Sequence, residues 1–279
     1  MSGVFLLIEN LLIFVDFPTW KLFSLLLISF FVGLLGGFVG LALGTIRLPF
    51  LLLFGIPPAT AAGTNIIISA SSSLSGMIRH FRDGRIDFKI ALMMGVPSVF
   101  AAFVGGLFSH RLNSDLLILF IGGFVAWQGV EFILMSKNKS NQKNSIPNSN
   151  YTHKNMIRNL SEAGIGLGIG LLGGLVGLIL GSIRLPALIR LLKVEPRIAA
   201  GTNTIIGFCM GFVGGLGHSI HGGIEYEIVL MMGLAAILGS YQGARLTGKV
   251  NLNLLLAFMG GVLSITGIVM FLRGVINLY

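Results

Sequence analysis

Long apolar stretches constrain this chain more than any other feature. Of its 279 residues, 54% are hydrophobic and only 10% are charged, far too little charge to cover the surface of a water-soluble domain. A membrane-spanning helix needs about 20 apolar residues, and nothing in the pattern suggests the alternation of a barrel. We therefore expect an all-α polytopic membrane protein, with candidate spans at 21–44, 59–78, 87–109, 114–135, 162–182, 198–217, 225–247 and 253–273.

The chain contains the same unusual segment twice. Residues 33–49 read GLLGGFVGLALGTIRLP and residues 170–186 read GLLGGLVGLILGSIRLP, identical at 14 of 17 positions. Further matches follow at a nearly constant offset, such as AAGTN at 61–65 and again at 199–203. Such agreement indicates an internal duplication, which is a common plan among secondary transporters.

The duplication divides the chain into four regions. Residues 1–20 form an N-terminal interfacial segment, 21–135 a first transmembrane repeat of about four helices, 136–160 a polar linker and 161–279 a second repeat. The linker is basic and rich in asparagine and serine, so we expect it to be flexible and cytoplasmic.

The charges that flank the spans differ between the two repeats. Residues 79–89 are strongly basic, whereas their counterpart at 218–227 contains two glutamates and no lysine or arginine. Conversely, 190–197 is basic and its counterpart in the first repeat is uncharged. This reversal predicts inverted repeats, with both basic segments in the cytoplasm. Inversion requires an odd number of crossings per half, which short apolar stretches at 45–56 and 182–194 could supply, so eight and ten crossings both stay open.

An arginine inside the repeated apolar segment is the residue that most suggests chemistry. Gly44 and Gly181 close a helical face of regularly spaced glycines, and Arg47 and Arg184 follow just before a proline. Proline cannot continue a helix but can begin one, so we expect a break and a short helix from Pro49 and from its counterpart. The exposed N–H groups and the arginine then predict an anion site, with both arginines converging on one anion between the repeats. The alternative is that the arginines snorkel to lipid headgroups.

The repeated AAGTN element offers neutral polar groups. Thr64, Asn65, Thr202 and Asn203 precede an aliphatic run in each half. They could complete the anion site at a second broken helix, or they could simply cap the start of a helix.

Two matched histidines, His80 and His218, follow the second span of each repeat. Because histidine titrates in the physiological range, they could couple transport to protons. The simpler interpretation is an exposed loop histidine in both places.

The remaining composition excludes several classes of protein. The single cysteine, Cys209, lies in an apolar run, so neither a disulfide framework nor a cysteine metal cluster is expected, and we expect no cofactor. The net charge is +9, and the basic residues lie in short segments between apolar runs, where such residues orient a membrane protein. The charge therefore does not indicate nucleic-acid binding. No phosphate-binding loop of the GxxxxGK[ST] type is present.

The stretch 33–68 combines a glycine-rich helix, a proline, an apolar stretch, a Gly-Ile-Pro turn and an Ala-x-Gly-Thr element, and the second copy repeats all of these except the Gly-Ile-Pro turn. This duplicated combination resembles the TauE/SafE family of sulfite-exporter-like membrane transporters, over roughly residues 20–275. The family commonly has consecutive glycines where this chain has Ala42-Leu43-Gly44, and an uncharged residue at the positions of Arg47 and Arg184. The resemblance implies transport, often export, of small sulfur-containing anions such as sulfite, sulfoacetate or other organosulfonates.

We therefore expect a transporter and not an enzyme, an exporter of such anions in the inner (plasma) membrane. Its partners would be a small anion, the lipid bilayer and, in a homo-oligomer, further copies of the chain. The alternatives are a transporter of another small anion, a non-transporting membrane assembly factor, and an intramembrane hydrolase built on SASSSLSGMIRH at 69–80, where serine and histidine could form a nucleophile and base.

Overall fold

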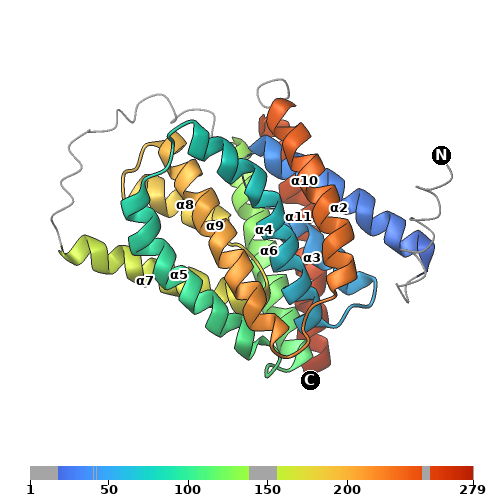
Figure 1. Ribbon diagram of the computed structural model, residues 1–279. Helices are drawn as coiled ribbons and strands as arrows, with labels where there is room; N and C mark the ends of the chain where they lie inside the picture. The colour runs from blue at the N-terminus through green and yellow to red at the C-terminus, as the bar shows by residue number, and fades with distance from the viewer. Residues whose placement is uncertain (1–17, 40, 42, 138–155, 247–251, 279) are drawn as a thin grey trace.

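A computed structural model describes residues 18–39, 41, 43–137, 156–246 and 252–278, and every regular element within these ranges is a helix (Figure 1). The expected segment 1–20 lies almost entirely outside the described residues, as does most of the linker at 136–160. The first half contains α2 (Thr19–Val39), α3 (Gly44–Leu53), α4 (Pro58–Arg82), α5 (Phe88–Ser109) and α6 (Ser114–Lys137). The second half contains α7 (Met156–Val176), α8 (Gly181–Pro186), the π-helix η1 (Ala187–Leu191), α9 (Pro196–Ser219), α10 (Tyr226–Leu246) and α11 (Leu252–Leu278).

The lengths and surfaces of the helices are those of a membrane protein. Within the described residues, five helices are long and apolar enough to cross a bilayer, namely α2, α5, α6, α9 and α11. Large apolar side chains point outward: Phe100, Leu254 and Phe258 are 66%, 71% and 67% exposed. Such surface is unfavourable in water but suits contact with lipid tails. The predicted polytopic all-α fold is confirmed.

The helices before both breaks end through the same local motif. Directly after α7, Gly177 adopts a φ of +74°, and Leu178 N donates to the Gly173 carbonyl oxygen at 2.8 Å. This is the Schellman termination, in which a left-handed glycine reverses the chain. In the first half, Leu41 N makes the equivalent bond to Gly36 O at 3.0 Å. Both helices therefore end with a hydrogen bond to the carbonyl oxygen of a repeated glycine.

The short helices begin earlier than the sequence predicts. The expectation of a start at Pro49 is wrong, because α3 begins at Gly44 and carries Pro49 inside it, and α8 likewise begins at Gly181 and includes Pro186. Pro49 and Pro186 are the sixth residues of α3 and α8, where proline keeps φ near the helical value but removes one hydrogen bond. As a result, Arg47 lies in the first turn of α3.

The short helix α3 folds back along α2. Lys21 Nζ, near the start of α2, donates to the carbonyl oxygen of Phe54 at 3.4 Å, just after α3 ends. The rings of Trp20 and Phe54 meet edge to face with centroids 6.0 Å apart. With ten residues, α3 is about 15 Å long at 1.5 Å per residue, half of the roughly 30 Å hydrocarbon core. The α2–α3 pair therefore returns to the end of the bundle where it began.

Helices α4 and α9 pack against each other at the centre. The other long helices each pack against a helix from the opposite half. Helix α2 packs on α10 of the second half, and its counterpart α7 packs on α5 of the first half (Figure 1). Two matched hydrogen bonds fix α4 and α9 as antiparallel. Glu225 N, after the end of α9, donates to Thr64 Oγ1 at 3.0 Å, and Asp87 N, after the end of α4, donates to Thr202 Oγ1 at 3.0 Å.

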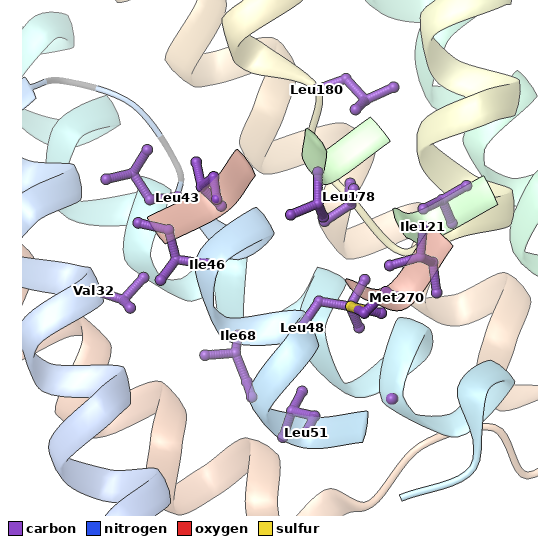
Figure 2. Close-up of a cluster of buried hydrophobic side chains, with 14 of the residues drawn as sticks. Val32, Leu43, Ile46, Leu48, Leu51, Ile68, Ile121, Leu178, Leu180 and Met270 are labelled. Atoms are coloured by element: carbon purple, nitrogen blue, oxygen red, sulfur yellow. The ribbon is translucent and has the colours of Figure 1, made fainter. Parts of the chain in front are cut away.

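The main apolar core surrounds α3 (Figure 2). Leu48 and Leu51 of α3 are fully buried, and they share one cluster with Leu178 from the break in the other half. Ile121 of α6 and Met270 of α11 belong to the same cluster. Burial of one leucine contributes about 1.5–3 kcal/mol, so this core holds the first turn of α3 firmly in the interior.

Candidate anion site

The first arginine is buried between α3 and α4. Arg47 is only 1% exposed. Its Nη1 donates to Ser69 Oγ at 3.3 Å and to Asn65 Oδ1 at 3.5 Å. Asn65 is itself held by a bond from Nδ2 to the carbonyl oxygen of Gly177 at 2.9 Å. The site of the first half thus contacts the helix break of the second half.

The second arginine occupies the equivalent place between α8 and α9. Arg184 is fully buried. Its Nη1 donates to the backbone oxygen and to Oδ1 of Asn203, both at 3.3 Å, and its Nη2 contacts Met210 Sδ at 3.1 Å. The same pairing of arginine with asparagine therefore recurs in both halves.

Both guanidinium groups are left incompletely satisfied. Among the described residues, the buried Nε atoms of Arg47 and Arg184 have no hydrogen-bond partner, and neither arginine forms an ion pair. A buried charge without a counter-charge is costly, and an unpaired buried donor costs about 1–3 kcal/mol. Burial inside the protein also argues against snorkelling, because neither side chain reaches the outer surface. Each half therefore holds a buried cationic group with an unused donor, an arrangement that suits an anion.

Glycines allow the broken segments to approach the asparagines. A Cβ at Gly44 would lie 2.2 Å from Ser69 Oγ, and one at Gly181 would lie 3.0 Å from Asn203 Nδ2. A side chain at either position would push the arginine-bearing helix away from α4 or α9. The predicted glycines are thus placed beside the predicted arginines and asparagines.

The threonines hold the two central helices together. Thr64 and Thr202 lie inside the continuous helices α4 and α9, whose caps are Pro57 and Glu195. The AAGTN element therefore forms neither a second break nor a helix cap, and both interpretations are wrong. Each threonine is the seventh residue of its helix and accepts a backbone hydrogen bond from the loop after the partner helix, which fastens α4 to α9.

Sequence reasoning missed some of the partners of the arginines. Ser69 and Met210 follow the two asparagines by four and seven residues, a spacing that places them on the same helical face. That periodicity could have identified them. Nothing in the sequence marks their contact with an arginine from another helix.

A cavity of about 740 Å³ opens near the second arginine. Its inner part includes Gly181, Asn203 and Gly207, and a Cβ at Gly207 would lie 3.8 Å from Arg184 Nη1. Its outer part lies where α4 and α10 end, and it carries Arg79, Arg82, Arg85 and Arg245. Arg85 pairs with Asp83 at 3.2 Å. The counterparts at the first arginine, Gly44 and Asn65, do not line this cavity.

The two matched histidines lie in different surroundings. His80 lines the cavity, and its buried Nδ1 has no partner among the described residues. His218 is 3% exposed, and its Nε2 donates to the carbonyl oxygen of Gly174 at 2.8 Å. Neither is a fully exposed loop residue, so the simpler interpretation of the pair is wrong.

The serines near His80 do not form a nucleophile–base pair. Ser71, Ser73 and Ser75 each donate to a carbonyl oxygen of their own helix. Within the described residues, no three His, Cys, Asp or Glu side chains converge on a point that could hold a metal ion.

A helical bundle with lipid-facing surfaces, two broken helices and a cavity leading to a buried arginine defines a membrane transporter. The comparisons agree. The family described as "Sulfite exporter TauE/SafE" matches residues 25–270, and the chain belongs to this family. It is a membrane transporter of the TauE/SafE family, as the sequence resemblance predicts.

Several relatives carry matching descriptions. "Probable membrane transporter protein YdhB" of Bacillus subtilis is 28% identical over 80% of this chain and 89% of its own length. "Probable membrane transporter protein YunE" of the same organism is 25% identical over 91% and 98%. "Sulfite exporter TauE/SafE family protein 6" of Arabidopsis thaliana is 32% identical over 34% of this chain and 23% of its own length. No solved structure gives a significant match.

Proposed function

We propose that the protein exports small sulfur-containing oxyanions, such as sulfite or organosulfonates, across the plasma membrane. The observation that carries this proposal is the pair of fully buried arginines, each with an unused Nε and no ion pair among the described residues. An oxyanion would supply the missing charge and accept the free donors. The family description, which names sulfite export, supports the same ligand class.

In this proposal Arg47 and Arg184 bind the anion between the two repeats. Asn65 and Asn203 orient the guanidinium groups, while Gly44 and Gly181 permit the close approach. Thr64 and Thr202 accept hydrogen bonds from Glu225 N and Asp87 N, and a role for their O–H groups as donors to the anion stays a prediction. The proposed partners are the anion, the bilayer and optional further copies of the chain.

The direction of export rests on the location of the basic residues. Arg79, Arg82 and Arg245 are exposed at the outer part of the cavity, and lysine and arginine accumulate on the cytoplasmic side of membrane proteins. A cavity open to the cytoplasm would load the anion from inside the cell. The antiparallel pairing of α4 with α9 supports inverted repeats, which are a common basis of alternating access.

Flux into proteoliposomes tests the function. Purified protein would be reconstituted and offered sulfite, sulfoacetate, sulfate, phosphate and acetate, each with protein-free vesicles as the control. We expect saturable flux of sulfite or a sulfonate, and an excess of phosphate or acetate should not inhibit this flux. Flux of phosphate or acetate alone would identify a transporter of another anion, and no flux of any of the five would favour the non-transporting assembly factor.

A further inference from the structure

Hydroxyl groups line the same cavity as the basic residues at its outer part and the residues Asn203 and Gly207 near Arg184. Ser72 and Ser75 of α4 and Ser240 of α10 belong to its wall. Ser75 Oγ and Ser240 Oγ lie 2.8 Å apart, and Ser240 Oγ also lies 3.3 Å from the carbonyl oxygen of Ser72. The three residues therefore form one polar cluster across two helices.

The equivalent positions in the other repeat are apolar. The sequence offset of 138 residues that pairs His80 with His218 also pairs Ser72 with Met210 and Ser75 with Val213. The same offset pairs Ala102 with Ser240. Met210 and Ala102 lie in a buried apolar cluster with Ile66, Ala70 and Ile179. One repeat thus presents hydroxyl groups to a cavity where the other repeat forms a closed apolar contact.

This difference between the repeats favours a binding role for the three serines over a packing role. Duplicated halves share their packing requirements, and the glycines and asparagines beside the arginines recur in both. Hydroxyl groups needed only to join these helices would be expected in both halves as well. They occur only where the cavity is open, and the same wall carries His80, whose Nδ1 has no partner among the described residues.

We infer that Ser72, Ser75 and Ser240 form an anion-binding station in the cavity, which an oxyanion occupies before it reaches Arg184. The inference rests on the proposed transport of oxyanions. Hydroxyl groups can rotate to donate to an oxyanion without adding charge. A pathway requires binding that is strong enough for the ion to enter and weak enough for it to leave. Neutral donors meet that requirement between two arginine-containing regions.

The variants are Ser75→Ala, Ser240→Ala and the double variant, with Ser71→Ala as the matched control. Ser71 lies on the same helix and, like Ser75, donates to a carbonyl oxygen of that helix at 3.1 Å, but it is not part of the cavity wall. Sulfite and sulfate are the probes, applied from the cavity side. Loss of one neutral hydrogen bond lowers affinity about twofold to tenfold, so the KM for flux should rise by that factor in each single variant and further in the double variant. Ser71→Ala should keep the wild-type KM.

Ser240→Cys guards against a purely structural effect, because it keeps the side-chain volume and replaces a strong donor with a weak one. It should raise KM like Ser240→Ala at an unchanged melting temperature. If the double variant keeps the wild-type KM while Arg184→Gln raises it, the serines do not form a binding station. The proposed function would then stand unchanged. Absence of sulfite and sulfate binding in the wild type would instead overturn the proposed function on which the station rests.

Discussion

His218 donates a hydrogen bond from Nε2 to the carbonyl oxygen of Gly174 at 2.8 Å, and so joins the end of α9 to α7. The equivalent pair in the other half is His80 and Gly37, and both of these residues line the cavity. One end of the bundle is thus closed by a contact whose counterpart at the other end is replaced by open space. The two ends differ although the sequence repeats, which is the asymmetry expected of one state in alternating access.

The first prediction compares the two histidines. His218→Ala should destabilise the protein more than His80→Ala, because it leaves the buried Gly174 carbonyl without a donor, at a cost of about 1–3 kcal/mol. His80 contributes no comparable bond through Nδ1. Thermal unfolding in detergent at pH 7.5 measures both, with Ser71→Ala as a neutral reference. Equal melting temperatures for the two histidine variants would contradict the assigned closing contact.

The second prediction concerns the arginines. A charge-assisted hydrogen bond is worth about 1.5–3 kcal/mol, so Arg47→Gln and Arg184→Gln should each weaken sulfite binding about tenfold to a hundredfold. Arg→Lys should restore only part of the affinity, since lysine lacks the planar fork. Calorimetry in detergent gives the affinities, and size-exclusion chromatography checks folding. Unchanged affinity in both folded glutamine variants would remove the arginines from the site.

The third prediction addresses proton coupling. Protonation of His80 adds positive charge to the cavity wall. Burial and the nearby Arg85 hold the pKa of His80 below its ordinary value of 6.5, so anion flux from the cavity side should rise as the pH falls below that value. His80→Gln should flatten this dependence. His218→Gln should leave the pH dependence of the flux unchanged, because His218 is buried and hydrogen-bonded to Gly174. Flux at pH 5.5 to 8 in proteoliposomes measures the effect, and an unaltered profile in His80→Gln would exclude it as the proton carrier.

The fourth prediction concerns orientation. If the repeats are inverted, the loop after α4 faces the cytoplasm and the loop after α9 faces outward. Cysteines at Asp83 and His221, in a Cys209→Ala background, test this with a membrane-impermeant maleimide on intact cells. These positions avoid Gly84 and Gly222, whose φ values of +66° and +69° would strain a cysteine. Only the cysteine at 221 should react from outside, and labelling of both from one side would refute inversion.

The sequence alone predicted most of the helices, because membrane spans depend on local hydropathy and length. Candidate spans such as 87–109 and 114–135 differ by no more than two residues from the bounds of α5 and α6. The repeated arginine, asparagine and glycine also identified the side chains that meet at each broken helix. Here the signal is local, since a glycine-terminated helix followed by an arginine recurs in both halves.

Only the tertiary structure revealed the roles that depend on contacts between distant segments. The threonines of AAGTN fasten α4 to α9, and Ser69 and Met210 complete the surroundings of the arginines. Neither fact follows from local pattern. The open cavity beside Arg184 and the closed contact at His218 could not be predicted from two nearly identical repeats. Equivalent sequences favour equivalent local structures, whereas the packing of the helices against one another determines which end is open.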